Sequence, residues 1–290
     1  MSESKITTIG VVGSGFMGGG IAQVAAMGGK EVFLYDSMPE ARNKAVEKIK
    51  WSLDKLKSKG KFDGVPDEVM NRLHPVEDME SLEKMELVIE AVYEHIPTKK
   101  ELLEKLGKIV GADSIIATNT SSIPLAQLED TVPSPERFIG MHFFGPVPIM
   151  KLLEIVMGSH TSEKILERVK PFAREIGKTP IVVRKPSPGF LVNRIFNAVT
   201  IEALRCFIEG VGTPQDIDMG MKLGYGWSAG PFEVLDNAGL DIVAGVFGVM
   251  GGEPPPQIKE MLDKGHMGRK TGQGFYKYDR PGGKRIIEDD

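Results

Sequence analysis

Cysteine is nearly absent from this sequence, and so is any large excess of charge of one sign. The 290 residues include a single cysteine, Cys206, which excludes an internal disulfide and is typical of a protein from a reducing compartment. The formal net charge is −4 and the isoelectric point is about 5.9. These values exclude a broad electrostatic attraction to nucleic acid or anionic lipid, so such a partner could be attracted only by a local basic patch. We therefore expect a small-molecule ligand and a cytoplasmic location, with no nucleic-acid partner.

Long hydrophobic runs are also missing. No apolar stretch approaches the ~20 residues that a membrane-spanning helix needs. The polar N-terminal residues lead directly into the strand-like segment ITTIGVV, so we expect no targeting leader and no membrane association. Internal repeats and low-complexity segments are lacking as well, and a length of 290 residues predicts about two domains, each with its own core.

Short β-branched segments alternate with longer helical patterns from Ile6 to Val183. The strand-like segments are ITTIGVV, EVFLY, LVIEAV, SIIAT, RFIGMHFF and TPIVVR. This alternation is typical of βαβ units, so the fold class expected here is α/β, with an N-terminal Rossmann-type, mostly parallel sheet.

The pattern changes at KPSPGF, which begins at Lys185 and reads as a hinge or linker because it holds two prolines and a glycine. We place the domain boundary there, with an α/β domain over residues 1–186 and an all-helical C-terminal domain over 187–290. After the linker, apolar residues recur at helical spacing, with Ile195, Val199 and Leu204 on one side of the expected helix. Cys206 lies in the same apolar pattern, where a free thiol usually acts as a small hydrophobic residue.

A glycine-rich turn joins the first expected strand to a helical segment. It reads Gly13-Ser14-Gly15-Phe16-Met17-Gly18, and Asp36 follows the next strand 23 residues after Gly13. In a dinucleotide fold, these three glycines permit the tight turn, the approach of the pyrophosphate and close helix–strand packing, while the acid binds the adenosine ribose. The alternative is an ordinary glycine-rich turn with a solvated Asp36, but strand, helix and acid all occur at the expected places.

Asp36 also favours NAD over NADP. Its carboxylate accepts hydrogen bonds from ribose hydroxyls and repels an added phosphate at the same place. Arg42 would weaken this preference if it turned back toward the ribose, but we expect it to lie on the surface of its helix.

The apolar run GMHFFGPVPIMKLLE at 140–154 contains His142 and Glu154, which are unfavourable in a core unless they are paired. The turn-prone GPVP between them predicts a hairpin-like return that brings the two side chains together. A carboxylate on one ring nitrogen would fix the tautomer and stabilise the imidazolium, as in a serine-hydrolase triad. Taken alone, each has a commoner interpretation: a hydrogen-bonded core histidine and a surface acid at a strand end.

Seven segments identify a resemblance to a known family. They are GSGFMG (13–18), VIEAV (88–92), NTSS (119–122), GMHFFGPVPIMKLLEIV (140–156), PGFLVNR (188–194), GPFEVLDNAGLD (230–241) and GRKTGQGFYKY (268–278). The chain resembles the L-3-hydroxyacyl-CoA dehydrogenases, a family that includes the 3-hydroxybutyryl-CoA dehydrogenases, over essentially its whole length. The resemblance implies reversible oxidation of an (S)-3-hydroxyacyl-CoA to a 3-oxoacyl-CoA, with NAD as cofactor and an acyl-CoA of the acetoacetyl-CoA class as substrate.

The resemblance also implies roles for single residues. It makes His142 the catalytic base and Glu154 its partner, and it places Ser121 and Asn193 against the substrate. A turn serine and a polar residue at a helix start are the alternatives for these two.

The remaining assignments by resemblance concern binding. The cofactor-binding residues are Gly13, Gly15, Phe16, Met17, Gly18, Asp36, Glu90, His95, Ser121 and Lys270, and Ser52 and Lys59 contact CoA. Surface or strand-end positions are the alternatives for Glu90, His95 and Lys270, and a solvated basic helix face for the lysines of 45–61. No metal ligand is implied. Where the family usually has HFFNP this chain has Gly145, which removes a polar side chain from the cofactor site.

A homodimer is implied by the family, with the apolar Val234, Leu235, Leu240 and Val243 as a candidate interface or, alternatively, as part of the domain's own core. Two other functions stay open at this point. One is a related hydroxy-acid dehydrogenase whose substrate carries no CoA. The other is a non-catalytic protein that binds NAD as a structural element or sensor, which would not need His142, Glu154, Ser121 and Asn193 together.

Overall fold

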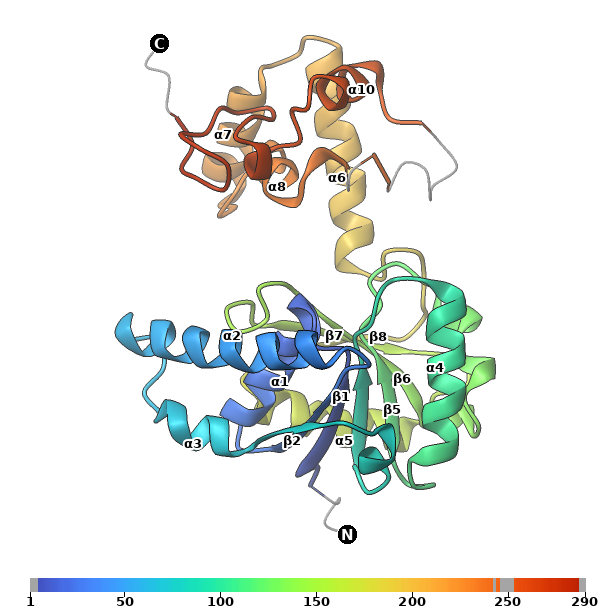
Figure 1. Cartoon of the computed structure of the whole chain (residues 1–290). Coiled ribbons are helices and arrows are strands. Elements are labelled where there is room, and N and C mark those ends of the chain that lie inside the picture. The colour runs from blue at the N-terminus through green and yellow to red at the C-terminus, as the bar shows by residue number, and fades with distance from the viewer. Residues whose placement is uncertain (1–4, 242–243, 246–252, 287–290) are drawn as a thin grey trace. The chain divides into compact units, whose positions relative to one another are not determined.

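The computed structural model describes residues 5–241, 244–245 and 253–286. The chain forms two compact units, Met1–Val192 and Asn193–Asp290 (Figure 1). The division by contacts falls a few residues after the boundary expected from the sequence, and the boundary at 186 stays a prediction.

The first unit is built on one eight-stranded sheet. Its strands are β1 (Thr8–Val12), β2 (Glu31–Tyr35), β3 (Leu73–Val76), β4 (Leu87–Glu90), β5 (Ile115–Thr118), β6 (Phe138–Phe143), β7 (Leu152–Met157) and β8 (Thr179–Val183). Their order across the sheet is β3-β2-β1-β4-β5-β6-β7-β8. All neighbours are parallel except β6 and β7, which are antiparallel. The order reverses between β1 and β4, and ligands of doubly wound sheets bind at such a point, beyond the carboxyl ends of the strands.

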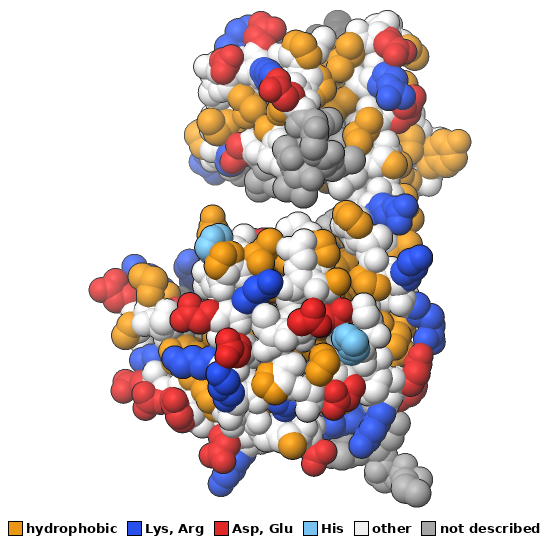
Figure 2. Space-filling view, turned by 90° about the vertical axis from the view of Figure 1, so that its right-hand side faces the viewer, with side chains coloured by type: hydrophobic (Ala, Val, Ile, Leu, Met, Phe, Trp, Pro, Cys, Tyr) orange, Lys and Arg blue, Asp and Glu red, His pale blue; other side chains and the backbone are white. Residues whose placement is uncertain are grey.

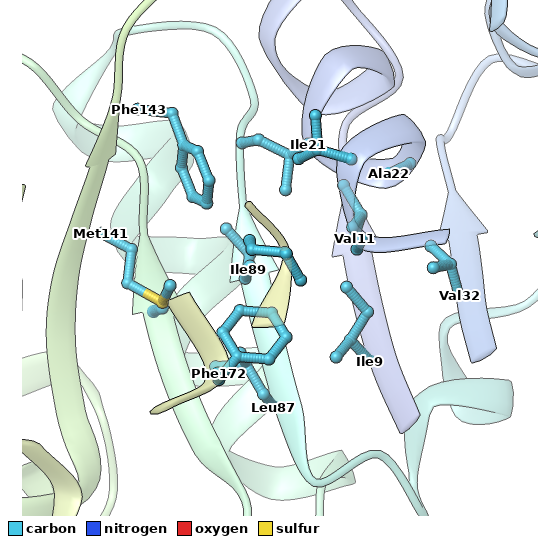
Figure 3. Packing of buried hydrophobic residues seen from close by; sticks show 14 of the residues in the cluster. Ile9, Val11, Ile21, Ala22, Val32, Leu87, Ile89, Met141, Phe143 and Phe172 are labelled. Atoms are coloured by element: carbon cyan, nitrogen blue, oxygen red, sulfur yellow. The ribbon is translucent and has the colours of Figure 1, made fainter. Parts of the chain in front are cut away.

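Helices cover both faces of this sheet. They are α1 (Phe16–Met27), α2 (Pro39–Ser58), α3 (Pro66–Asn71), α4 (Ile96–Ile109) and α5 (Glu163–Glu175), with short 3₁₀ turns η1 (Met79–Leu82), η2 (Leu125–Gln127), η3 (Glu129–Thr131) and η4 (Pro135–Arg137). On one face, α1, α2 and α5 share a core with the strands, and Figure 3 shows Ile21 of α1 and Phe172 of α5 against Ile89 of β4. On the other face, α4 packs through Leu103 and Leu106.

Strand β3 was not expected from the sequence. Its four residues include His74 and Pro75, which lack the β-branched pattern of the other strands. Proline cannot donate a ladder hydrogen bond and is tolerated at sheet edges, and β3 is the edge strand.

The second unit is mainly helical. Its described elements are α6 (Val192–Ile208), α7 (Pro214–Tyr225), α8 (Pro231–Ala238), α10 (Pro256–Asp263) and the 3₁₀ turn η5 (Arg269–Thr271), and within the described part of this unit extended pairing is limited to isolated bridges. The rings of Phe207, Phe232 and Phe275 meet at its centre. Leu235 and Leu240 are buried in the same core, so these two pack within the chain rather than at a surface, and Val243 lies outside the described residues.

Two buried carboxylates connect segments of this unit through hydrogen bonds to backbone N–H groups. Asp218 accepts hydrogen bonds from the backbone N–H groups of Phe232 and Glu233 at the start of α8, and Asp236 accepts them from Phe275 and Tyr276. Burial raises the pKa of both carboxyl groups, and the hydrogen bonds only partly offset this effect. In the described parts of both units, no helix is both long enough and apolar enough to cross a membrane.

Candidate active site

The antiparallel pair β6 and β7 brings His142 and Glu154 together. The two residues are opposite each other in the ladder, and Nδ1 of His142 lies 2.7 Å from Oε2 of Glu154. Both are buried, with 4% and 0% of their surface exposed. The contact expected from the GPVP turn is therefore present.

The second oxygen of Glu154 is held by the backbone. Oε1 accepts N–H bonds from Leu191, at 3.2 Å, and from Val192, at 2.9 Å, where α6 begins. Burial alone would raise the pKa of Glu154, but the hydrogen bond and charge of His142 and the two N–H donors together lower this pKa below its ordinary value. The carboxylate thus stays ionised while it contacts the imidazole.

Aromatic rings surround the imidazole of His142. The Phe144 ring lies 4.5 Å from it and the Phe190 ring 5.5 Å, measured between centroids. Phe190 adopts a left-handed backbone conformation with φ of 51°, in the turn that leads to α6. Within the first unit, Nε2 of His142 forms no hydrogen bond, so this nitrogen is the one available to exchange a proton with a ligand.

Side chains alternate between the two faces along each strand, and this alternation places further polar residues on the same face of the sheet as His142 and Glu154. Thr118 lies opposite Glu90, and both point to the face that α4 covers. Thr118 donates a 2.6 Å hydrogen bond to Glu90, and Lys99 of α4 forms a 2.6 Å ion pair with the same carboxylate. Glu90, at the end of β4, is fully buried, so the alternative of a surface position for this residue is wrong.

The segment after β5 is fixed by Glu94. One oxygen of Glu94 accepts hydrogen bonds from the Thr120 hydroxyl and from the backbone N–H groups of Ser121 and Ser122, at 3.1 and 3.3 Å. Lys99 also lies 3.2 Å from the other oxygen of Glu94. Hydrogen bonds with Thr120 and with Lys99 lower the pKa of Glu94 although burial, the largest single effect, raises it. Ser121 itself is exposed beyond the end of β5.

Sequence reasoning missed Lys99, Glu94 and Asn119. Lys99 shares a helix face with Leu103 and Leu106, and a lysine on an apolar stripe is the signal that could have singled it out. Asn119 accepts a 2.9 Å hydrogen bond from the N–H of Phe143 and so ties the end of β5 to β6. His95 is exposed at the N-terminal cap of α4, where its ring contacts the Thr98 hydroxyl at 2.9 Å.

The glycine turn has the geometry of a phosphate cradle. Gly13 has a φ of 96°, which a side chain would strain. A β-carbon on Gly18 would lie 1.8 Å from the carbonyl oxygen of Gly13, whereas a β-carbon on Gly15 would have no atom within 4 Å. The turn is therefore closed on its inner side and open where a ligand must approach the start of α1.

Asp36 lies beside this turn. One carboxylate oxygen accepts 2.7 Å hydrogen bonds from both the N–H and the hydroxyl of Ser14, and the other accepts one from the N–H of Met38. Asp36, Gly13 and Tyr35 line a pocket of about 250 Å³ at the ends of β1 and β2. The expectation for Arg42 was wrong: its side chain is buried, and it donates to the carbonyl oxygen of Val76 at 2.9 Å.

A larger pocket, of about 640 Å³, lies between α1, α2 and the turn after β6. Ser52 and Lys59 both line it. The other lysines of its lining are Lys44, Lys48, Lys55 and Lys61. Its walls also include exposed Trp51 and the apolar Pro146, Pro148 and Ile149. This combination suits a ligand with both anionic and apolar parts.

Gly145 lies in the turn after β6, and its backbone supports the ring of Phe16. A β-carbon on Gly145 would come within 2.6 Å of Cε1 of Phe16. The ring thus occupies the space that a longer side chain at 145 would need.

Asn193 and Lys270 belong to the second unit. Asn193 lies in the first turn of α6, and the Lys270 ammonium lies 2.5 Å from the Asp241 carboxylate. Their roles toward substrate and cofactor stay predictions.

Comparisons with known proteins cover nearly the whole chain. Residues 8–186 match the family model described as 3-hydroxyacyl-CoA dehydrogenase, NAD binding domain, and residues 189–278 match the corresponding C-terminal domain. A probable 3-hydroxybutyryl-CoA dehydrogenase of Deinococcus radiodurans is 41% identical over 276 residues, which is 93% of this chain and 99% of that protein. The human mitochondrial hydroxyacyl-coenzyme A dehydrogenase is 38% identical over 285 residues, covering 92% of this chain and 90% of the relative.

Among solved structures, the (S)-3-hydroxybutyryl-CoA dehydrogenase PaaH1 of Ralstonia eutropha aligns with a TM-score of 0.88 at 39% identity. The alignment covers 95% of this chain and all of that one.

Proposed function

The chain belongs to the 3-hydroxyacyl-CoA dehydrogenase family, and we propose that it interconverts an (S)-3-hydroxyacyl-CoA, such as 3-hydroxybutyryl-CoA, and the 3-oxoacyl-CoA. It is an NAD-dependent dehydrogenase. The observation that carries the proposed chemistry is the buried contact between His142 and Glu154, 2.7 Å apart.

The glycine turn fits the pyrophosphate of NAD, because Gly15 leaves room beside the N–H groups that open α1. When bound, NAD accepts or supplies the hydride at the carbon that carries the reacting oxygen. The remaining tasks fall to the chain: its residues must orient the substrate and move the proton. We assign the choice of NAD over NADP to Asp36, whose negative charge disfavours a second ribose phosphate.

His142 serves as general base in the oxidation and as general acid in the reverse reaction. With Nδ1–H donating to Glu154, the lone pair lies on Nε2, which takes the proton of the substrate hydroxyl. The ionised Glu154 then stabilises the imidazolium that forms. Ser121 and Asn193 are proposed to bind the substrate oxygen and its carbon chain.

The pocket between α1 and α2 is proposed to bind CoA. Its lysines face a ligand whose phosphates are anionic, and Ser52 and Lys59 are the specific contacts we assign. The apolar Trp51, Pro146 and Ile149 suit the adenine or the pantetheine chain. Comparing turnover of acetoacetyl-CoA with turnover of free acetoacetate, each with NADH, tests this assignment against a dehydrogenase of acids without CoA. Equal turnover of the two would contradict it.

The test of the chemistry is His142→Gln, which keeps a polar side chain and removes the base. We expect kcat for acetoacetyl-CoA reduction to fall by about 10²–10⁴-fold, the usual contribution of a general acid or base. The affinity for NADH, measured by its fluorescence, should stay unchanged because His142 lies outside the glycine turn. Wild-type turnover in the folded variant would refute the assigned role.

Two further features of the protein are proposed. The family resemblance and the exposed apolar residues Met219, Leu223 and Tyr225 on α7 support a homodimer formed through the second unit. Figure 2 shows hydrophobic side chains at the surface of this unit. A cytoplasmic location is supported by the single free thiol, Cys206.

A further inference from the structure

Lys178 is a buried cation directly before β8. Only 6% of its surface is exposed, and its ammonium donates to two backbone carbonyls, that of Val147 and, at 2.8 Å, that of Met150. No carboxylate in the described parts of the chain forms an ion pair with it. Burial lowers the pKa of Lys178 to about 8. A charge held this way is costly, and an apolar side chain of similar volume would avoid the cost.

The two acceptors belong to one short turn. Residues 144–151 connect β6, which carries His142, to β7, which carries Glu154. Inside this turn, the N–H groups of Ile149 and Met150 both donate to the carbonyl oxygen of Pro146. Lys178 adds bonds to the carbonyls of residues 147 and 150 and so fixes the turn from the β8 side.

The same turn also packs against α1. Val147 is buried, and a β-carbon on Gly20 would lie only 2.8 Å from the Cβ of Val147. Pro146, Pro148 and Ile149 then form one wall of the pocket that also contains Ser52 and Lys59. The position of this wall therefore depends on Lys178 and on the contact with Gly20.

We propose that Lys178 is a positioning residue for the substrate: its ammonium sets the turn 146–150, and that turn shapes the pocket for the CoA-bearing ligand. The inference rests on the proposed function of that pocket. His142 and Glu154 are held separately, by the strand register and by the N–H groups of Leu191 and Val192. Loss of the ammonium should therefore affect substrate binding more than the chemical step.

Lys178→Met tests this, with Lys30→Met as a matched control. Lys30 is equally buried and also donates to a backbone carbonyl, that of Ile6, but it pairs with Glu175 and makes no bond to the turn 146–150. We expect Lys178→Met to raise KM for acetoacetyl-CoA about tenfold, leaving kcat within about twofold and KM for NADH unchanged. The control should leave all three constants near the wild-type values.

A binding measurement without NADH gives an independent readout. Trp51 lines the pocket, and replacing Trp227 by phenylalanine leaves Trp51 as the only tryptophan. In this background, titration with CoA should show about tenfold weaker binding for Lys178→Met and normal binding for Lys30→Met. A purely structural Lys178 would lower the unfolding temperature without changing either KM or CoA affinity, and that result would overturn the inference.

Gly20→Ala reaches the same turn without touching Lys178, so it tests the other half of the inference, that the turn shapes the pocket, even if Lys178→Met does not fold. Its added methyl group pushes on Val147 and should also raise KM for acetoacetyl-CoA and weaken CoA binding. Unchanged KM and CoA affinity in this variant would contradict the inference. Failure of the proposed function would give a different result from failure of this inference. The wild-type protein itself would then neither turn over acetoacetyl-CoA nor bind CoA.

Discussion

At the scale of single residues, the ionised state of Glu154 links the site to stability. The folded protein lowers the pKa of this carboxyl below its ordinary value. The ionised form therefore contributes stability that is fully present above the unfolded-state pKa of about 4.3, and this contribution is lost as the pH falls through the folded-state pKa.

Glu154→Gln should accordingly destabilise the first unit by about 1–3 kcal/mol at pH 7, and the difference from wild type should shrink below about pH 4. Urea unfolding followed by Trp51 fluorescence in the Trp227→Phe background measures it. Glu167→Gln, on an exposed face of α5, is the control and should change stability by less than about 0.5 kcal/mol. If the stability difference between wild type and Glu154→Gln grew toward low pH, folding would raise the pKa of Glu154 instead of lowering it.

Asp36 combines two tasks, because the carboxylate that is proposed to exclude NADP also holds Ser14. Asp36→Ala should lower the preference for NADH over NADPH at least about tenfold, since it removes a like-charge contact worth more than about 1.4 kcal/mol. Ser14→Ala keeps the charge and loses one hydrogen bond, so it should raise KM for both cofactors and leave their ratio unchanged. Steady-state kinetics with the two cofactors separates these outcomes, and an unaltered ratio in Asp36→Ala would assign selectivity elsewhere.

At the scale of elements, two glycines of the turn 13–18 should have different tasks, one in stability and the other in cofactor binding. Gly18→Ala would place a methyl group 1.8 Å from the Gly13 carbonyl oxygen, so α1 must move away from β1. We expect a loss of about 1–3 kcal/mol in unfolding free energy, as for an overpacked core.

Gly15→Ala is the matched variant, because its methyl group meets no atom within 4 Å. Stability should stay within about 0.5 kcal/mol of wild type. NADH affinity, measured by fluorescence titration, should still fall at least about tenfold if the pyrophosphate approaches the backbone there. Normal NADH binding by Gly15→Ala would place the cofactor elsewhere.

The elements that the sequence predicted are those with a strong local pattern. The β-branched segments became β1, β2, β4, β5, β6 and β8, and GPVP joined β6 to β7 with His142 opposite Glu154. Strand β3 was not predicted, because its pairing with β2, and not its composition, makes it extended.

Polar residues inside the fold were harder to predict than the strands. Arg42 has the helical spacing of Ala45 and Ile49 and is buried with them, so periodicity was a better guide than the charge of its side chain. The role of Lys178 depends on two carbonyl partners 28 and 31 residues away, which no local pattern specifies. The partners of Lys99 are nearer, at Glu90 and Val92, and its place on the apolar face of α4 was the signal to follow.

At the scale of the whole molecule, the proposed dimer makes a prediction about α7. Leu223 is 81% exposed, so its replacement by aspartate should leave the fold intact. If α7 forms the interface, Leu223→Asp buries an unpaired charge there and shifts the protein from twice its chain mass of 31.7 kDa to the monomer. Sedimentation velocity measures this shift. Val65→Asp, at an exposed apolar residue of the first unit, should have no effect on mass, and a wild-type monomer would contradict the dimer.

Both oxygens of the Glu154 carboxylate must accept hydrogen bonds, because one faces the imidazole and the other faces the N–H groups where the chain enters α6. An amide has one accepting end and one donating end. Turned one way, a glutamine would point its NH₂ at two backbone donors. Turned the other way, it would donate to Nδ1 and invert the tautomer of His142, leaving a hydrogen on the nitrogen that the proposed reaction needs bare.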